Sequence, residues 1–181
     1  MTASVVKAWL VADHLRIHGW DERLSPIIRD SANEEAWDIY AALGREQSIE
    51  RMISLCGLTD SMPGEDLSMT LMSARDTVRL GQCLADGRAA GNEWTPWLLD
   101  EMRAVRGMGD FGIRHAFESP ARERIAIKNG WEKRAALGEW NVNCLALHEG
   151  WIMAVLTRYP SSLPLAHGVD ICKRLAGEIV C

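Results

Sequence analysis

The sequence predicts an α+β fold in a single domain over residues 1–181. We expect a helical part at about 4–118, then a three-stranded antiparallel sheet and a C-terminal helix at about 122–181. Before residue 118, apolar side chains recur at helical spacing between Gly and Pro breaks. Beyond Pro120 short apolar runs of strand length follow. With 181 residues, 48% of them hydrophobic, the chain is long enough for one core.

The first predicted helix runs from Ser4 to His18 and is apolar on almost every side. Such a pattern indicates an element buried on most of its faces. Gly19 ends it. Ser25-Pro26 then predicts an N-cap and a first-turn proline.

The remaining helices are predicted from caps and glycine ends. Ser31 and Glu34 have the spacing of a capping box, and so do Ser73 and Asp76. The segment 58–70, which holds Pro63-Gly64, is expected to be a surface loop. The helices after the first are expected over 26–30, 35–43, 47–56, 73–87 and 95–107.

The predicted sheet follows from three apolar runs near the C-terminus. The first run alternates around Ile125 and Ile127 and is expected to end at Lys128, beside a cleft. The strands are expected over 125–128, 140–147 and 151–157, and the closing helix over 165–180. That helix should pack on the sheet.

Charge and composition exclude several function classes. A net charge of -5 gives no basic face for nucleic acid. No apolar run approaches the roughly 20 residues that a membrane span needs, and no secretory segment follows Met1. As written, the chain is therefore expected to be neither exported nor membrane-bound.

Five cysteines at irregular spacing, without C-x-x-C, indicate neither a disulfide framework nor a zinc cluster. We expect buried free thiols in a reducing compartment. They are Cys56, Cys83, Cys144, Cys172 and Cys181. His14 and His18 have the spacing of a metal pair on a helix, but ordinary histidines at a helix end explain them better.

Ser4 and Lys7 stand at the head of the first helix, three residues apart and hence on one face. Lys7 is the only charge between Met1 and Asp13. An unpaired buried ammonium loses its proton readily, so a neutral Lys7 could take the proton of the Ser4 hydroxyl. The alternative is that Ser4 caps the helix and Lys7 reaches to water.

Ser31 and Asn33 form a second candidate motif. In a working site Ser31 would give a proton to a departing nitrogen, and Asn33 would hydrogen-bond the substrate's amide. Helix capping is the competing explanation for Ser31.

Lys128-Asn129-Gly130 is the third motif, and Asn-Gly is also a common hairpin turn. We prefer a strand beside a cleft, because the residues after Trp131 do not resemble a returning strand. Lys128 would then bind a substrate carboxylate, and Gly130 would allow close backbone approach. The Trp131 N–H would complete an oxyanion hole with that of Ser4.

Taken in order, the three motifs resemble those of the serine β-lactamase and penicillin-binding DD-peptidase superfamily, closest to class A-like actinobacterial hydrolases. The resemblance implies catalytic roles for Ser4 as nucleophile, Lys7 as base, Ser31 as relay and Lys128 as electrostatic partner. It implies substrate binding by Asn33, Asn129, Gly130 and Trp131. The implied ligand is a β-lactam or a peptidoglycan-like peptide. No cofactor or metal is implied.

The chain departs from the family pattern in three respects. The family's N-terminal strands are missing, so the chain looks truncated and its last strand is expected to be an open edge, available for a homo-oligomer. Ala32 stands where the middle motif usually has Asp. No Glu-x-x-Leu-Asn loop is recognisable near Glu65 and Asp66, so slow turnover is expected. A truncated, non-catalytic binding module is therefore the alternative function.

Overall fold

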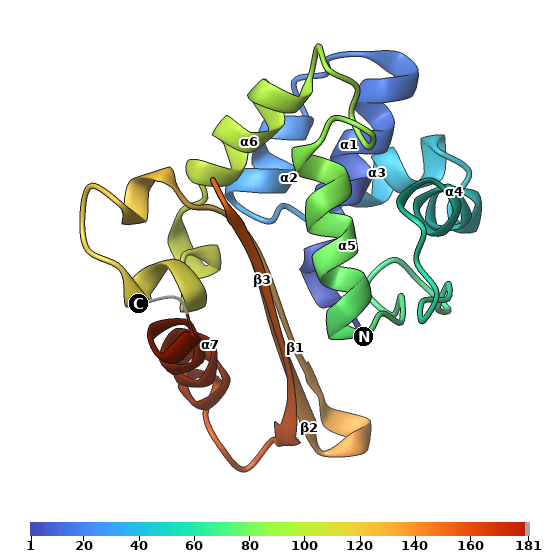
Figure 1. The fold of residues 1–181 in the computed structure, drawn as a ribbon. Coiled ribbons are helices and arrows are strands. Elements are labelled where there is room, and N and C mark those ends of the chain that lie inside the picture. Colours follow the sequence, from blue (N-terminus) through green and yellow to red (C-terminus); the bar gives the residue numbers. More distant parts are fainter. Residues whose placement is uncertain (180–181) are drawn as a thin grey trace.

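A three-stranded antiparallel sheet lies between two groups of helices in a computed structural model that describes residues 1–179 (Figure 1). Helix α5 (Ala74–Ala85) packs on β2 and β3, and α6 (Thr95–Arg103) packs on β1. Helix α7 (Leu165–Ile179) covers the sheet from the opposite side. The predicted order of a helical part, a sheet and a closing helix is confirmed.

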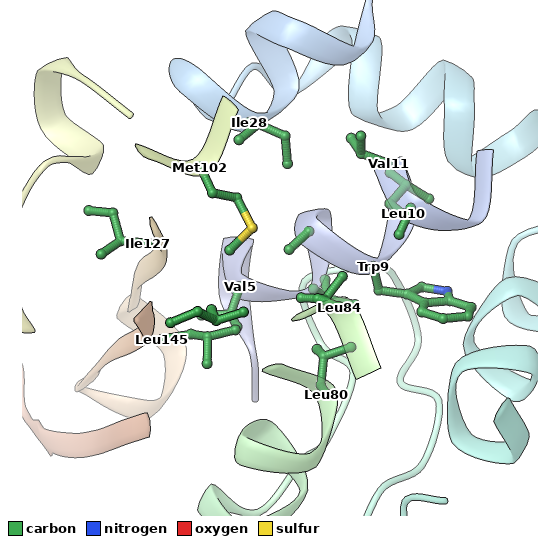
Figure 2. Close-up of a cluster of buried hydrophobic side chains, with 14 of the residues drawn as sticks. Val5, Trp9, Leu10, Val11, Ile28, Leu80, Leu84, Met102, Ile127 and Leu145 are labelled. Atoms are coloured by element: carbon green, nitrogen blue, oxygen red, sulfur yellow. The ribbon is translucent and has the colours of Figure 1, made fainter. Parts of the chain in front are cut away.

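The core is built around α1 (Lys7–His18), which follows a 3₁₀ turn, η1 (Ala3–Val6). The prediction that this helix is buried on most faces is confirmed, since Trp9 and Leu10 are fully buried. Figure 2 shows α1 surrounded by side chains from the helices and from both β1 and β2. Gly19 ends α1 at a φ of 81°, a conformation that glycine adopts without strain.

Three shorter helices surround α1, and all were expected from the sequence. They are α2 (Leu24–Arg29), α3 (Glu34–Ala42) and α4 (Glu46–Cys56). Polar groups join α4 to α1: the Trp9 indole donates to the Ser48 carbonyl at 2.9 Å, and Ser48 Oγ donates to buried Asp13 at 2.7 Å. Buried polar groups satisfied in this way fix how the two helices pack.

The predicted helix caps are confirmed only in part. Ser73 Oγ accepts a hydrogen bond from the Asp76 N–H at 3.1 Å, as a capping serine should. Ser31 does not cap α3, because the N-cap is Asn33 and no side chain bonds the free N–H groups there. Ser25 does not cap α2 either, since it lies inside the helix and its hydroxyl donates to Glu101.

The sheet has the order β1-β2-β3, with strands β1 (Ala126–Arg134), β2 (Glu139–His148) and β3 (Trp151–Pro160). The expected end of the first strand at Lys128 is wrong, since Lys128 pairs with Leu145 and the strand continues to Arg134. The segment after Trp131 carries charged residues because this end of β1 is only partly covered. Strand β3 pairs only with β2 among the described residues, as the predicted open edge requires.

The prediction of free thiols is wrong for four of the five cysteines. Cys56 and Cys83 form a disulfide between α4 and α5, and Cys144 and Cys172 form one between β2 and α7. Partners 27 and 28 residues apart meet only through tertiary packing, so spacing could not reveal them. Disulfides persist in oxidising surroundings, and a reducing compartment no longer follows. Cys181 lies outside the described residues.

No helix within residues 1–179 combines the length and apolarity needed to span a bilayer. Between α4 and α5 the chain forms the expected loop over residues 58–70, whose Leu67 and Thr70 turn inward and are buried. This loop, η1, the start of α3 and β1 surround the site described next.

Candidate active site

A pocket of about 590 Å³ opens where the N-terminal turn meets the loop and β1. Its lining contains residues of the first two sequence motifs and Trp131, which directly follows the third, although they are far apart in the chain. The predicted site residues in the lining are Ser4, Lys7, Ser31, Asn33 and Trp131. Lys128, Asn129 and Gly130 lie behind this surface.

Ser4 is held at the mouth of the pocket by backbone contacts on both sides. The N–H groups of Thr2 and Ala3 donate to the Thr70 and Ser68 carbonyls at 2.9 and 3.0 Å. Ala3 adopts a φ of 46°, which is rare for a residue with a side chain. Strain of this kind commonly persists at functional sites. The Ser4 N–H has no acceptor among residues 1–179, so it is free to bind an oxyanion.

Gly130 brings β1 directly against the backbone of Ser4. A Cβ at Gly130 would lie 2.5 Å from the Ser4 nitrogen and 2.7 Å from the Thr2 carbonyl oxygen. The close backbone approach expected at Gly130 is therefore occupied by η1, and the glycine sets the position of Ser4.

Lys7 is buried and directed to the second motif. Its Nζ donates to the Ser31 carbonyl and to Asn33 Oδ1, both at 2.6 Å. Burial lowers the pKa of Lys7 to about 8, and the Glu35 carboxylate opposes that shift. No hydrogen bond joins Lys7 to the Ser4 hydroxyl in the described part of the chain. The Lys7 amine therefore belongs to a residue one helical turn from Ser4, and its lowered pKa means that it loses its proton more readily than an exposed lysine.

Ser31 stands between two lysines. Its carbonyl accepts from Lys7, and its Oγ accepts from Lys128 Nζ at 2.9 Å. Ser31 has a φ of 59°, so its hydroxyl turns away from the start of α3 and toward β1. This strained conformation explains why the capping box predicted for Ser31 does not form.

Lys128 is 1% exposed and lies beneath Ser31. Burial and, to a smaller extent, the charge of Lys7 together lower the pKa of Lys128 to about 7. Among residues 1–179, its only other acceptor is the Asn129 carbonyl, at 3.4 Å. Lys128 thus acts on the pocket through the Ser31 hydroxyl, and a direct contact with a substrate carboxylate is not prepared.

Asn129 and Trp131 have different surroundings from those expected. The Asn129 amide donates to the Gly109 and Phe111 carbonyls at 3.0 and 2.8 Å, so its side chain points away from the pocket. Substrate binding by Asn129 stays a prediction, and its amide group is not directed at the pocket. Trp131 does line the pocket and meets Phe111 edge to face, with ring centroids 5.6 Å apart.

Several further residues line the pocket beside the predicted catalytic and substrate-binding residues. Asp30 and Arg106 form a bidentate ion pair at the rim, with distances of 2.7 and 2.8 Å. Trp37 and Met108 are large, exposed apolar side chains in the lining. Only their positions in the fold identify them, because exposed apolar residues have no signature in a single sequence.

The loop over residues 58–70 brings no carboxylate into the pocket. Its lining residues are Leu67 and Ser68. Asp66 accepts hydrogen bonds from Ser68 Oγ and the Met69 N–H, at 2.8 and 3.0 Å, and Glu65 is exposed. Neither acid is placed to activate a water at Ser4.

The histidine pair on α1 forms no metal site with a third ligand. His14 and His18 have ring centroids 5.0 Å apart, and the nearest acid to His14 is Asp21 at 3.9 Å. Within residues 1–179 no three His, Cys, Asp or Glu side chains gather as metal ligands.

Comparison with known proteins identifies the fold. No protein-family model matches the chain, and no curated protein matches it. A class A β-lactamase from Mycobacterium abscessus superposes with a TM-score of 0.75 at 18% identity, over 99% of this chain and 84% of that one. A β-lactamase from Chitinophaga pinensis gives 0.75 at 15% identity, over 96% and 80%.

A class A β-lactamase from Bacteroides cellulosilyticus gives a TM-score of 0.74 at 14% identity, over 96% of this chain and 79% of that one. The chain therefore has the fold of the serine β-lactamase superfamily. This confirms the fold that the resemblance implied.

Proposed function

We propose that the protein is a serine acyl-transfer hydrolase that forms an acyl-enzyme on Ser4 with β-lactams or with related amides and esters. The observation that carries the proposal is that Ser4, Lys7 and Ser31 line one pocket, with Lys128 bonded to Ser31 from behind. The fold shared with class A β-lactamases supports the same reaction type.

Acylation would begin with transfer of the Ser4 hydroxyl proton to neutral Lys7, as Oγ attacks the ligand's carbonyl carbon. The pKa of Lys7, lowered to about 8 by burial, makes the neutral amine accessible near neutral pH. The free Ser4 N–H, together with the Trp131 N–H, would stabilise the oxyanion.

Ser31 would then deliver a proton to the departing nitrogen as the C–N bond breaks, and Lys128 would replace that proton through its 2.9 Å hydrogen bond. Asn33 Oδ1 is occupied by Lys7, which leaves its Nδ2 for the ligand's amide. Water or an acceptor amine would resolve the acyl-enzyme, slowly, because the loop over residues 58–70 supplies no base.

A second candidate is a binding module of the same fold that does not turn over. Two observations favour it: Lys7 donates to Ser31 and Asn33 with no hydrogen bond to Ser4, and no loop acid reaches the pocket. In that case the pocket would hold the same ligands without a covalent step.

Incubation with a fluorescent penicillin, followed by intact-protein mass spectrometry, separates the two candidates. We expect a covalent adduct in the native protein that is lost in Ser4→Ala. Ser68→Ala is the matched control, because it removes another serine of the same pocket. Absence of an adduct from the native protein, or an adduct that persists in Ser4→Ala, overturns the catalytic proposal.

A further inference from the structure

Glu132 is a pocket carboxylate that has no ion-pair partner among residues 1–179. The other acid in the lining, Asp30, is neutralised by its bidentate pair with Arg106. Glu132 Oε2 is buried and accepts no hydrogen bond, while the side chain as a whole is partly exposed. The Met1 ammonium interacts with Glu132 through space without forming an ion pair. A partly desolvated carboxylate without a partner gains most from a cation supplied by a ligand.

The position of Glu132 along β1 fixes where that cation would lie. Alternate residues of a strand share a face, so Lys128, Gly130 and Glu132 project to the same side of β1. Lys128 reaches Ser31, Gly130 contacts the backbone of Ser4, and Glu132 lines the pocket. Each step of two residues spans about 7 Å.

The charged side chains along β1 therefore have opposite signs on the two sides of Ser4. A cation lies about 7 Å to one side of the Ser4 contact along β1, and an unpaired carboxylate lies about 7 Å to the other side. A ligand whose own charges are arranged in the opposite order fits this field best.

We infer that the pocket selects a zwitterionic acyl compound, with its carboxylate toward Ser31 and Lys128 and an ammonium group toward Glu132. The inference rests on the proposed acylation of Ser4 and adds the charge of the substrate's side chain. An ammonium at Glu132 makes a charge-assisted hydrogen bond, which corresponds to about tenfold or more in affinity.

Ampicillin and benzylpenicillin test the inference, since they share a carboxylate and differ by one amino group on the acylamino side chain. At about pH 7 that α-amine is mostly protonated. We expect ampicillin to acylate the native protein about tenfold faster. Glu132→Gln should equalise the two rates, and Glu132→Lys should reverse their order. Glu149→Gln, at the exposed turn between β2 and β3, removes the same charge outside the pocket and should preserve the preference.

Equilibrium binding of the same pair to Ser4→Ala, measured by titration calorimetry, keeps this test separate from the acylation proposal. Tighter binding of ampicillin that disappears in Ser4→Ala/Glu132→Gln supports the inference even if no adduct ever forms. Equal rates and equal affinities for the two compounds overturn the inference while leaving acylation intact. Failure of both compounds to bind Ser4→Ala overturns the inference, whereas only the absence of a Ser4 adduct from the native protein overturns acylation.

Discussion

Replacement of Gly130 by alanine should displace Ser4. The added Cβ would lie 2.5 Å from the Ser4 nitrogen, 2.7 Å from the Thr2 oxygen and 2.8 Å from the Val5 nitrogen. Ordinary contact begins at 3.4 Å, so the backbones must separate by about 0.9 Å (3.4 − 2.5). These are backbone atoms, and the N–H groups of neighbouring Thr2 and Ala3 hold the segment to the Thr70 and Ser68 carbonyls, so the atoms cannot rotate away as a side chain would. Overpacking of this kind costs about 1–3 kcal/mol of unfolding free energy.

The effect on chemistry should exceed the effect on stability. A displacement of about 1 Å in a reacting group lowers its rate by about 100-fold. We expect Gly130→Ala to remain folded at 25 °C by urea denaturation, with acylation by a fluorescent penicillin reduced about 100-fold. Gly177→Ala is the control, because a Cβ there meets nothing within 4 Å and the residue lies in α7. A Gly130→Ala protein with native stability and a native acylation rate would refute the role assigned to this contact.

Four further predictions follow from the structure. The acylation rate should pass through a maximum between about pH 7 and 8, because the reaction needs unprotonated Lys7, whose pKa is about 8, and protonated Lys128, whose pKa is about 7; a rate that is flat across this range contradicts the assignment. The free energy of unfolding should rise as pH increases above about 7. The reason is that Lys128 and Lys7 have pKa values of about 7 and 8 in the folded protein, whereas both hold their protons up to about pH 10.5 in the unfolded chain. Urea titrations at several pH values would detect the rise. Replacement of Cys144 and Cys172 by alanine should cost about 3.5 kcal/mol from loop closure over 28 residues, seen as a melting temperature lower by about 7–14 °C, and an unchanged melting temperature is the contrary result. The free edge of β3 should pair with a second copy, so light scattering should show a dimer, whereas a monomer at every concentration argues against it.

The sequence predicted the fold well where local chemistry decides the structure. Gly19 ends α1 as expected, because backbone with a positive φ at a helix end favours glycine. The end of β1 was missed because Trp131 to Arg134 pair with β2 while the charged side chains remain partly exposed. The disulfides were not predicted because each one joins two elements that meet only after folding.

The site was predicted in composition more than in geometry. Ser4, Lys7 and Ser31 do meet in one pocket, as the motif order indicated. The contact of the Asn129 amide with Gly109 and Phe111 could not be predicted, because it depends on a loop about 20 residues earlier in the chain. Glu132 was not predicted as a site residue, because its sequence position does not show that its buried Oε2 lacks a hydrogen-bond partner.

The nucleophile proposed for this pocket is Ser4. Proteolysis of the penicillin-treated protein, followed by tandem mass spectrometry, identifies the modified residue directly. The account predicts that the acyl group is found on Ser4. Acylation of Ser31 or Ser68, or recovery of the Ser4 peptide unmodified from protein that carries an adduct, would contradict it.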